Sequence, residues 1–302
     1  MQVKTVVVDT DAGADDLLAI YYLIKAKKYR NIKIVANYGI FSREECLSRI
    51  SYFLSLIKTD KKIEIFLGEK QPLKGKFLPF YHIHGNKWIN KKPIRVNQIN
   101  NNSFNDKFDY LSIGPLTNLS KLIKNNNFLK KINKLLIMGG AILTPGNATP
   151  LAEANFYWDP IAVEQVLLKL SEKIVLVPLN ITEKIQLNLS DLKTEPLKTF
   201  FKPYLNYYIK NKKFFFTEKL EKTKYIGAAV HDLLAAILLE HQQQNSKKKL
   251  YLSTKLIKKE PGFIFPVFNK GSQKNDKIFA VTVVDKVNKK LIDSILNEFF
   301  KK

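Results

Sequence analysis

Short apolar runs alternate with amphipathic stretches over the first half of the chain. The runs are rich in β-branched residues and predict buried strands at 4–9, 32–37, 63–67, 110–113, 134–138 and 174–177. Between them, apolar residues recur at helical spacing, which predicts helices at 15–26, 43–57, 115–124 and 160–170. This alternation is typical of an α/β fold with a doubly wound, mostly parallel, Rossmann-like sheet and helices on both faces.

The remaining segments follow a different pattern. Residues 70–107 and 141–157 show no clear period and predict long loops. After Pro178 the pattern becomes mainly helical, with helices expected at 204–213 and 226–241. Strands are expected near 249–257, 262–267 and 278–284, before a last helix at 289–300. No repeat or boundary interrupts the chain, so we expect a single domain over 1–302.

Four carboxylates lie where the first strand ends and the first helix begins. They are Asp9, Asp11, Asp15 and Asp16, with Gly13 between the two pairs. Carboxylates this close repel one another, and a divalent cation would relieve the repulsion. Their oxygen atoms suit a hard ion such as Ca²⁺ or Mg²⁺.

Three other interpretations of these acids were considered. Helix capping needs one acid, whereas four are present. An EF-hand loop is excluded, because a strand precedes the acids and Ile20 occupies the position of the closing Glu. A phosphatase of the haloacid dehalogenase type uses Asp-x-Asp after its first strand, which would be Asp9 and Asp11. It leaves Asp15 and Asp16 without a role.

Further polar residues follow later strands, where the ligand sites of parallel sheets collect. Asn147, Glu153 and Asn155 offer amide and carboxylate groups that suit a polyhydroxylated ligand such as a sugar. His231 and Asp232 open an apolar helical run, and a buried helix seldom starts this way unless both have partners. Asp232 could complete a cation site, and His231 could act as an acid.

Composition narrows the possible partners. The net charge of +23 makes nucleic acid a candidate partner. However, only four of the 50 basic residues are arginines, and the lysines are spread along the chain. Specific phosphate and base recognition tends to use Arg forks, so no specific nucleic-acid partner is expected. No apolar run is long enough for a bilayer, so no membrane partner is expected. The absence of a signal peptide and the single cysteine, Cys46, favour the cytoplasm.

At this point the motifs resemble those of the calcium-dependent nucleoside hydrolases, which cleave the N-glycosidic bond of ribonucleosides to free base and ribose. The resemblance spans nearly the whole chain. The motifs occur in the family's order: Asp9-x-Asp11-x-Gly13-x-Asp15-Asp16, Gly114-Pro115-Leu116-Thr117-Asn118, Met138-Gly139-Gly140, Gly146-Asn147-x-Thr149-Pro150-x-Ala152-Glu153-x-Asn155, Asp159-Pro160 and His231-Asp232.

The resemblance implies a role for each motif. Ca²⁺ would be held by Asp11, Asp16, Asp232 and the main-chain carbonyl of Thr117. Asp15 would be the general base and His231 would face the nucleobase. Asn147, Glu153 and Asn155 would hold the ribose, and His84 would also reach the ligand. The resemblance further implies nucleoside salvage and a homo-oligomer, either a dimer or a tetramer.

Three positions depart from the family pattern. The acidic motif usually has Pro where this chain has Ala12. Gly39-Ile40 stands where a Gly-Asn is usual, and Lys87-Trp88 replaces the glycines that usually follow a His-Gly. A catalytically impaired nucleoside-binding member of the family is therefore a second hypothesis. One of the aromatic residues Phe214, Phe215, Phe216 and Tyr225 is expected to cover the base.

Overall fold

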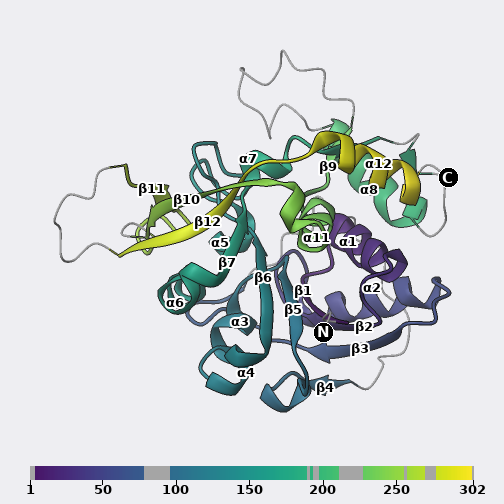
Figure 1. The fold of residues 1–302 in the computed structure, drawn as a ribbon, viewed down its shortest axis with the longest axis horizontal. Coiled ribbons are helices and arrows are strands. Elements are labelled where there is room, and N and C mark those ends of the chain that lie inside the picture. The colour runs from purple at the N-terminus through teal and green to yellow at the C-terminus, as the bar shows by residue number, and fades with distance from the viewer. Residues whose placement is uncertain are drawn as a thin grey trace.

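The computed structural model describes residues 4–77, 96–188, 191–192, 197–210, 227–254, 257–268 and 277–300. Its centre is a ten-stranded sheet with the order β11-β10-β12-β7-β6-β5-β1-β2-β3-β4 (Figure 1). The strands are β1 (Thr5–Thr10), β2 (Asn31–Ala36), β3 (Lys62–Leu67), β4 (Asn97–Gln98), β5 (Phe108–Ser112), β6 (Ile132–Met138), β7 (Ile174–Val177), β10 (Ser246–Ser253), β11 (Phe265–Pro266) and β12 (Ile278–Lys286). From β12 to β4 every neighbouring pair is parallel.

The central strands form because their apolar residues are buried on both faces of the sheet. Val6 and Val8 of β1 belong to one hydrophobic cluster and Val7 to another, and all three are fully buried. Successive side chains of a strand point to opposite faces, so a continuous apolar run fits a sheet covered on both sides. The predicted doubly wound fold is confirmed.

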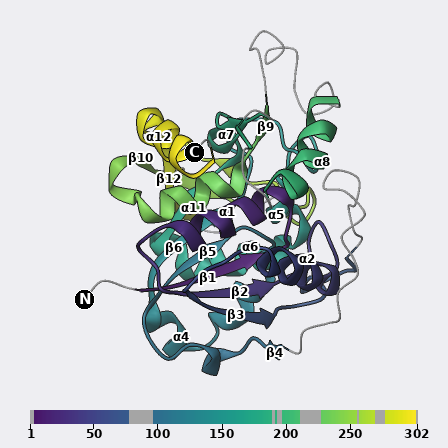
Figure 2. The ribbon, with the colours of Figure 1, turned by 90° about the vertical axis from the view of Figure 1, so that its right-hand side faces the viewer.

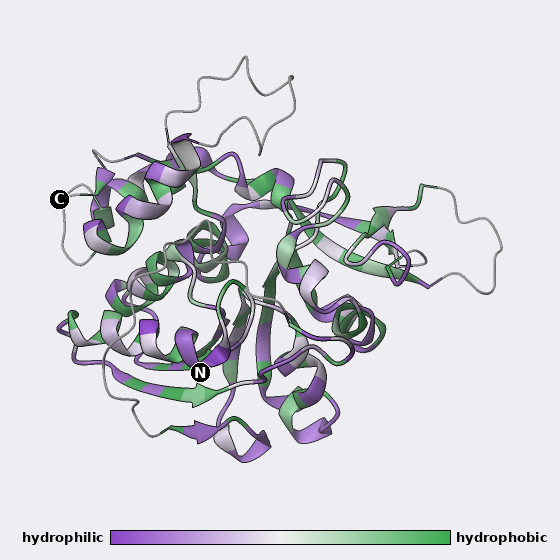
Figure 3. Cartoon of the chain, turned by 180° about the vertical axis from the view of Figure 1, so that it is seen from behind, coloured by the Kyte–Doolittle hydropathy of each residue, from purple (hydrophilic) through white to green (hydrophobic). Residues whose placement is uncertain are grey.

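Helices cover both faces of the sheet. The helices are α1 (Ala14–Lys25), α2 (Arg43–Ser55), α3 (Thr117–Leu122), α4 (Asn126–Lys131), α5 (Ala154–Trp158), α6 (Pro160–Leu170), α7 (Leu179–Thr182), α8 (Leu197–Lys210), α11 (His231–Glu240) and α12 (Lys289–Phe300). Figure 2 shows α1, α11 and α12 on one side of the sheet and α4 on the other. The outer helix α12 carries both hydrophilic and hydrophobic residues along its length (Figure 3). Among the described helices, none combines the length and apolarity needed to cross a bilayer.

Several segments differ from the sequence prediction, among them α4 and β4, which were not predicted. Helix α8 begins at Leu197, although Pro203 lies within it, and the predicted end at 213 lies outside the described residues. Helix α11 begins at His231 rather than at 226, because β9 (Ala228–Ala229) pairs with β8 (Gln186–Leu187) in a separate small sheet. The segment expected to be an irregular loop at 141–157 contains α5.

The C-terminal strands extend the main sheet. Strand β12 pairs in parallel with β7, and β10 lies antiparallel to β12. The chain order of the parallel strands reverses at β1, which has β2 on one side and β5 on the other. Ligands of doubly wound proteins bind at such a switch point, beyond the carboxyl ends of the strands.

Candidate active site

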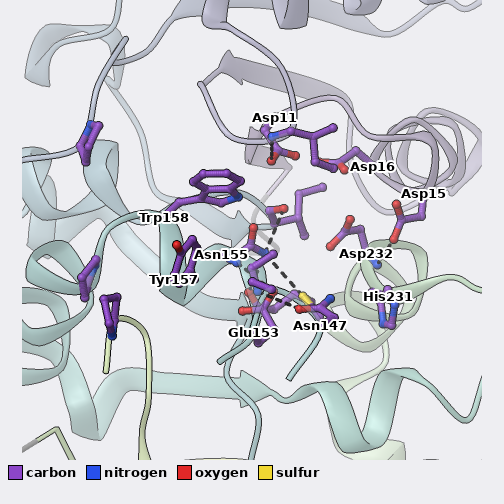
Figure 4. A pocket seen from close by; sticks show the side chains of 18 of the residues that line it. Asp11, Asp15, Asp16, Asn147, Glu153, Asn155, Tyr157, Trp158, His231 and Asp232 are labelled. Atoms are coloured by element: carbon purple, nitrogen blue, oxygen red, sulfur yellow. Dashed lines mark hydrogen bonds between the residues drawn. The ribbon is translucent and has the colours of Figure 1, made fainter. Parts of the chain in front are cut away.

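A cavity of about 540 Å³ lies at this switch point. Its acidic wall contains Asp11, Asp15, Asp16 and Asp232, and Figure 4 shows these side chains across the cavity from Asn147, Glu153 and Asn155. The acids come from the loop after β1, from the first turn of α1 and from the first turn of α11. The cavity therefore joins residues that are more than 200 positions apart in the sequence.

Three of the acids are close enough to share one ion. Asp15, Asp16 and Asp232 each have a carboxylate oxygen within 4.8 Å of the others, and all three are buried. Burial, followed by the charges of neighbouring carboxylates, raises the pKa of Asp15 and Asp232. Within the described residues, one oxygen of Asp16 (Oδ2) and one of Asp232 (Oδ1) are buried without a hydrogen-bond partner. Uncompensated buried oxygens are costly, and a divalent cation fits this donor set.

Asp11 is held at the edge of this group by main chain. The Ile40 N–H donates to its Oδ2 at 2.8 Å. A Cβ at Gly39 would lie 2.0 Å from the same oxygen, so only glycine allows this approach. At the position where the family usually has Asn, the chain thus offers Asp11 a backbone donor, and Ile40 lines the cavity.

Asp9 is not part of the cavity lining. Its Oδ2 accepts from Tyr110 Oη at 2.8 Å, and its Oδ1 accepts from Asn118 Nδ2 at 2.8 Å and from Asn37 Nδ2 at 3.3 Å. The carboxyl group is fully buried, and this burial raises its pKa to about 7. Asp9 is therefore a structural residue that ties β1 to β5, to α3 and to the residue after β2, and it is not placed to act as a phosphatase nucleophile.

Asp15, in the first turn of α1, lies near His231 and Asp232 at the start of α11. The Asp232 N–H donates to Asp15 Oδ2 at 3.4 Å. His231 Nδ1 lies 2.7 Å from the hydroxyl of Thr182, at the end of α7. This contact fixes the imidazole ring through Nδ1, so Nε2 is the nitrogen left for a ligand in the cavity that His231 lines.

The opposite wall is fixed by hydrogen bonds to main chain. Glu153 is the N-cap of α5 and accepts from the N–H groups of Gly140, Asn155 and Phe156. Burial raises its pKa to about 7. Asn155 Nδ2 donates to the carbonyls of Ile113 and Met138, which leaves its Oδ1 to accept. Asn147 Oδ1 accepts from the Ala154 N–H, which leaves its amide N–H groups to donate.

Thr117 is the one predicted site residue among the described ones that the cavity does not include. Its hydroxyl donates to Asp159 Oδ2 at 2.6 Å. As the first residue of α3, Thr117 has its carbonyl directed along the helix axis toward the next turn. Ile113, just after β5, does line the cavity. His84 lies outside the described residues, as do Phe214, Phe215, Phe216 and Tyr225.

Several cavity residues were missed by the sequence analysis. Glu183, Tyr204, Tyr157, Trp158, Lys74 and Lys76 all line the cavity. Tyr157 and Trp158 adjoin a predicted motif, but the irregular pattern of 141–157 hid helix α5. Glu183 follows the predicted strand at 174–177, and polar residues beyond a parallel strand were a usable signal.

Comparison with known proteins agrees with these motifs. The model of the family described as inosine-uridine preferring nucleoside hydrolase matches residues 6–292. The chain is 29% identical over 204 residues to uridine nucleosidase 1 of Arabidopsis thaliana, covering 63% of this chain and 60% of that protein. It is 26% identical over 246 residues to the pyrimidine-specific ribonucleoside hydrolase RihA of Salmonella typhi, covering 75% and 76%.

Solved structures share the fold. The purine-preferring ribonucleoside hydrolase from Gardnerella vaginalis superposes with a TM-score of 0.79 at 18% identity, covering 99% of this chain and 98% of that one. The chain spans about 60% of the length of the first plant relatives. Since the family model covers nearly the whole chain, the protein belongs to the inosine-uridine preferring nucleoside hydrolase family.

Proposed function

We propose that the protein hydrolyses the N-glycosidic bond of ribonucleosides to free base and ribose. The observation that carries this proposal is the single cavity in which four carboxylates face Asn147, Glu153 and Asn155. One wall can hold a cation and activate water, and the other can bind sugar hydroxyls. Family membership supports the same reaction.

We infer that Ca²⁺ binds the acidic wall through Asp11, Asp16 and Asp232. The unpartnered oxygens of Asp16 and Asp232 support this assignment. The main-chain carbonyl of Ile113 is a better fourth candidate than that of Thr117, because Ile113 lines the cavity and Thr117 does not. When bound, such an ion supplies positive charge that lowers the pKa of a neighbouring water and attracts ribose hydroxyls.

Asp15 serves as the general base in this proposal. It removes a proton from the water that adds to the ribose C1′, while the bond from C1′ to the base nitrogen breaks. The Asp232 N–H donates to Asp15 Oδ2, so one oxygen is held and the other is left for the water. Burial raises the pKa of Asp15, which strengthens it as a base.

The ribose is positioned by the opposite wall. Asn155 presents its Oδ1 as an acceptor for a hydroxyl, and Asn147 presents amide donors. The Glu153 carboxylate, fixed by three backbone N–H groups, has lone pairs left for another hydroxyl. Holding the ring in one orientation favours an oxocarbenium-like transition state. His231 faces the base, and His84 remains a predicted contact.

The test is a panel of ribonucleosides assayed for free ribose with and without a chelator. The names of the two curated relatives, a uridine nucleosidase and a pyrimidine-specific hydrolase, make uridine and cytidine the first substrates of the panel. We expect ribose release that the chelator abolishes and added Ca²⁺ restores. Tight nucleoside binding without ribose release would favour an impaired binding protein instead, and full activity in the chelator would exclude the metal.

We propose that residues 1–302 act as one domain in a cytoplasmic homo-oligomer, a dimer or a tetramer. The cavity draws on residues from Asp11 to Pro261, which supports a single unit. The family resemblance supports the oligomer. Light scattering coupled to size-exclusion chromatography measures the molar mass directly. A monomer at assay concentration would exclude the homo-oligomer.

A further inference from the structure

Glu183 lines the active-site cavity, yet none of the motifs includes it. It directly follows Thr182, whose hydroxyl lies 2.7 Å from His231 Nδ1. Its backbone N–H donates to the Leu179 carbonyl at 3.0 Å, so the turn that carries it is fixed to α7. Glu183 therefore lies on the His231 side of the cavity, where the resemblance places the nucleobase.

The Glu183 carboxyl group differs from the other acids of the cavity. Over the described ranges, no hydrogen bond or ion pair engages it, whereas three backbone N–H groups hold Glu153. The side chain is half-buried, so a ligand in the cavity can reach it. Burial raises the pKa of Glu183 to about 7, with no charged neighbour contributing, so it carries a proton in part of the molecules at neutral pH.

We propose that Glu183 is the acid that protonates the departing nucleobase. This inference rests on the proposed nucleoside hydrolysis and adds its second proton transfer. As the bond from C1′ to the base nitrogen breaks, its electron pair goes to the base, and the Glu183 carboxyl gives its proton to a nitrogen or carbonyl oxygen of that base. Water supplies hydroxyl to C1′ and a proton to Asp15. Solvent then returns a proton to Glu183 and accepts one from Asp15.

The arrangement separates two carboxyl groups with opposite tasks. Asp15 lies in the acidic cluster, where it takes a proton, and Glu183 lies outside that cluster with no acid as an electrostatic neighbour. Pairs of carboxyl groups in different environments commonly divide the acid and base roles in this way. His231, held by Thr182 beside the same turn, orients the base while Glu183 supplies the proton.

The experiment compares two leaving groups in the parent protein and in Glu183→Gln. Glutamine keeps the shape and can hydrogen-bond, but it has no acidic proton. We expect kcat on uridine or the best nucleoside to fall by about 10²–10⁴-fold. We expect kcat on p-nitrophenyl β-D-ribofuranoside to stay within about threefold, because nitrophenolate leaves without a proton and so removes the general-acid contribution. Glu172→Gln, at an exposed position away from the cavity, is the matched control and should match the parent on both substrates.

The outcomes separate this inference from the proposed function. Retained nitrophenyl activity also shows that the variant is folded. Equal losses on both substrates, or no loss on either, would overturn the role of Glu183 while leaving nucleoside hydrolysis intact. A parent protein that releases ribose from neither substrate would overturn the proposed function, and the role of Glu183 with it.

Discussion

Ala12 adopts a backbone conformation that explains why the usual proline is absent. Its φ is +59°, in the left-handed region, and proline is confined to about −65°. The Ala12 N–H donates to Thr10 Oγ1 at 3.0 Å, and its carbonyl accepts from Arg49 Nε at 2.8 Å. The loop that carries the acids therefore depends on a residue with an N–H and a positive φ.

Ala12→Pro should lower the free energy of unfolding by at least about 2 kcal/mol, through the lost hydrogen bond and the incompatible φ. Ala12→Gly should stay within about 1 kcal/mol of the parent, because glycine accepts the same φ. Chemical denaturation of both variants measures the difference. A proline variant as stable as the parent would mean that this loop can adopt another conformation.

The role of Asp15 can be distinguished from that of the neighbouring acids by measuring ion binding and turnover on the same variants. Asp15→Asn should reduce kcat by about 10²–10⁴-fold, because the amide cannot accept the proton of water. Calcium titration calorimetry should still detect the ion, since the proposed ligands remain. Asp16→Asn is the matched comparison and should lose both the ion and turnover. Near-normal turnover by Asp15→Asn would exclude its role as base.

The sequence located the acids but could not assign them all. Asp9 and Asp11 alternate along a strand, so both were expected on the same side. Only the fold shows that Tyr110 and Asn118, about 100 positions later, take up both oxygens of Asp9. Partners this distant in sequence leave no local pattern. The same limit applies to the carbonyl ligand, since the motif containing Thr117 does not reveal where its backbone points.

At the scale of elements, the Glu153 side chain both caps helix α5 and forms part of the cavity wall. The helix has five residues, too few for a recognisable period, and Glu153 caps it through the N–H groups of Asn155 and Phe156. Strands such as β1 and the helix α2, which Ser42 caps, were foreseen because their signals are local. Helix α11 was predicted too long because the pairing of Ala228 with Leu187 is not a local signal.

Glu153→Ala should destabilise α5 and displace Asn155 with it. The lost cap costs about 0.5–2 kcal/mol, and the Gly140 N–H loses its acceptor as well. We therefore expect KM for nucleosides to rise and kcat to fall. Asp191→Ala removes a turn hydrogen bond from Asn188 outside the cavity and serves as the comparison, with a stability change but no change in KM. An unchanged KM in Glu153→Ala would argue against a ribose contact.

At the scale of the whole molecule, protons bound by buried acids make stability depend on pH. The pKa values of Glu153 and Glu183 are raised from 4.5 to about 7, and that of Asp9 is raised from 3.8 to about 7. The folded protein therefore holds protons that the unfolded chain has released, so the free energy of unfolding falls as pH rises from about 4.5 to about 7. Between pH 5.5 and 8 the loss should be on the order of 2 kcal/mol per group.

Denaturant unfolding in a chelator at pH 5.5 and pH 8 measures this loss. Exposed carboxylates are ionised throughout this range, so they contribute little to the difference. Glu183→Gln should reduce the difference between the two pH values. A protein equally stable at both would show that none of these groups holds its proton near neutrality.

The acidic wall is built from residues at the start of α1 and from Asp232 of α11. Because these segments lie far apart in the chain, they emerge from the ribosome at different times. Helix α1 is buried along almost its whole length and packs against α11, which leaves the ribosome more than 200 residues later. Until then its apolar face has no partner, and such nascent segments depend on chaperones to avoid aggregation. The proposed ion site is complete only after Asp232 is in place. The proposed Ca²⁺ would therefore bind finished molecules and slow their unfolding rather than guide the emerging chain.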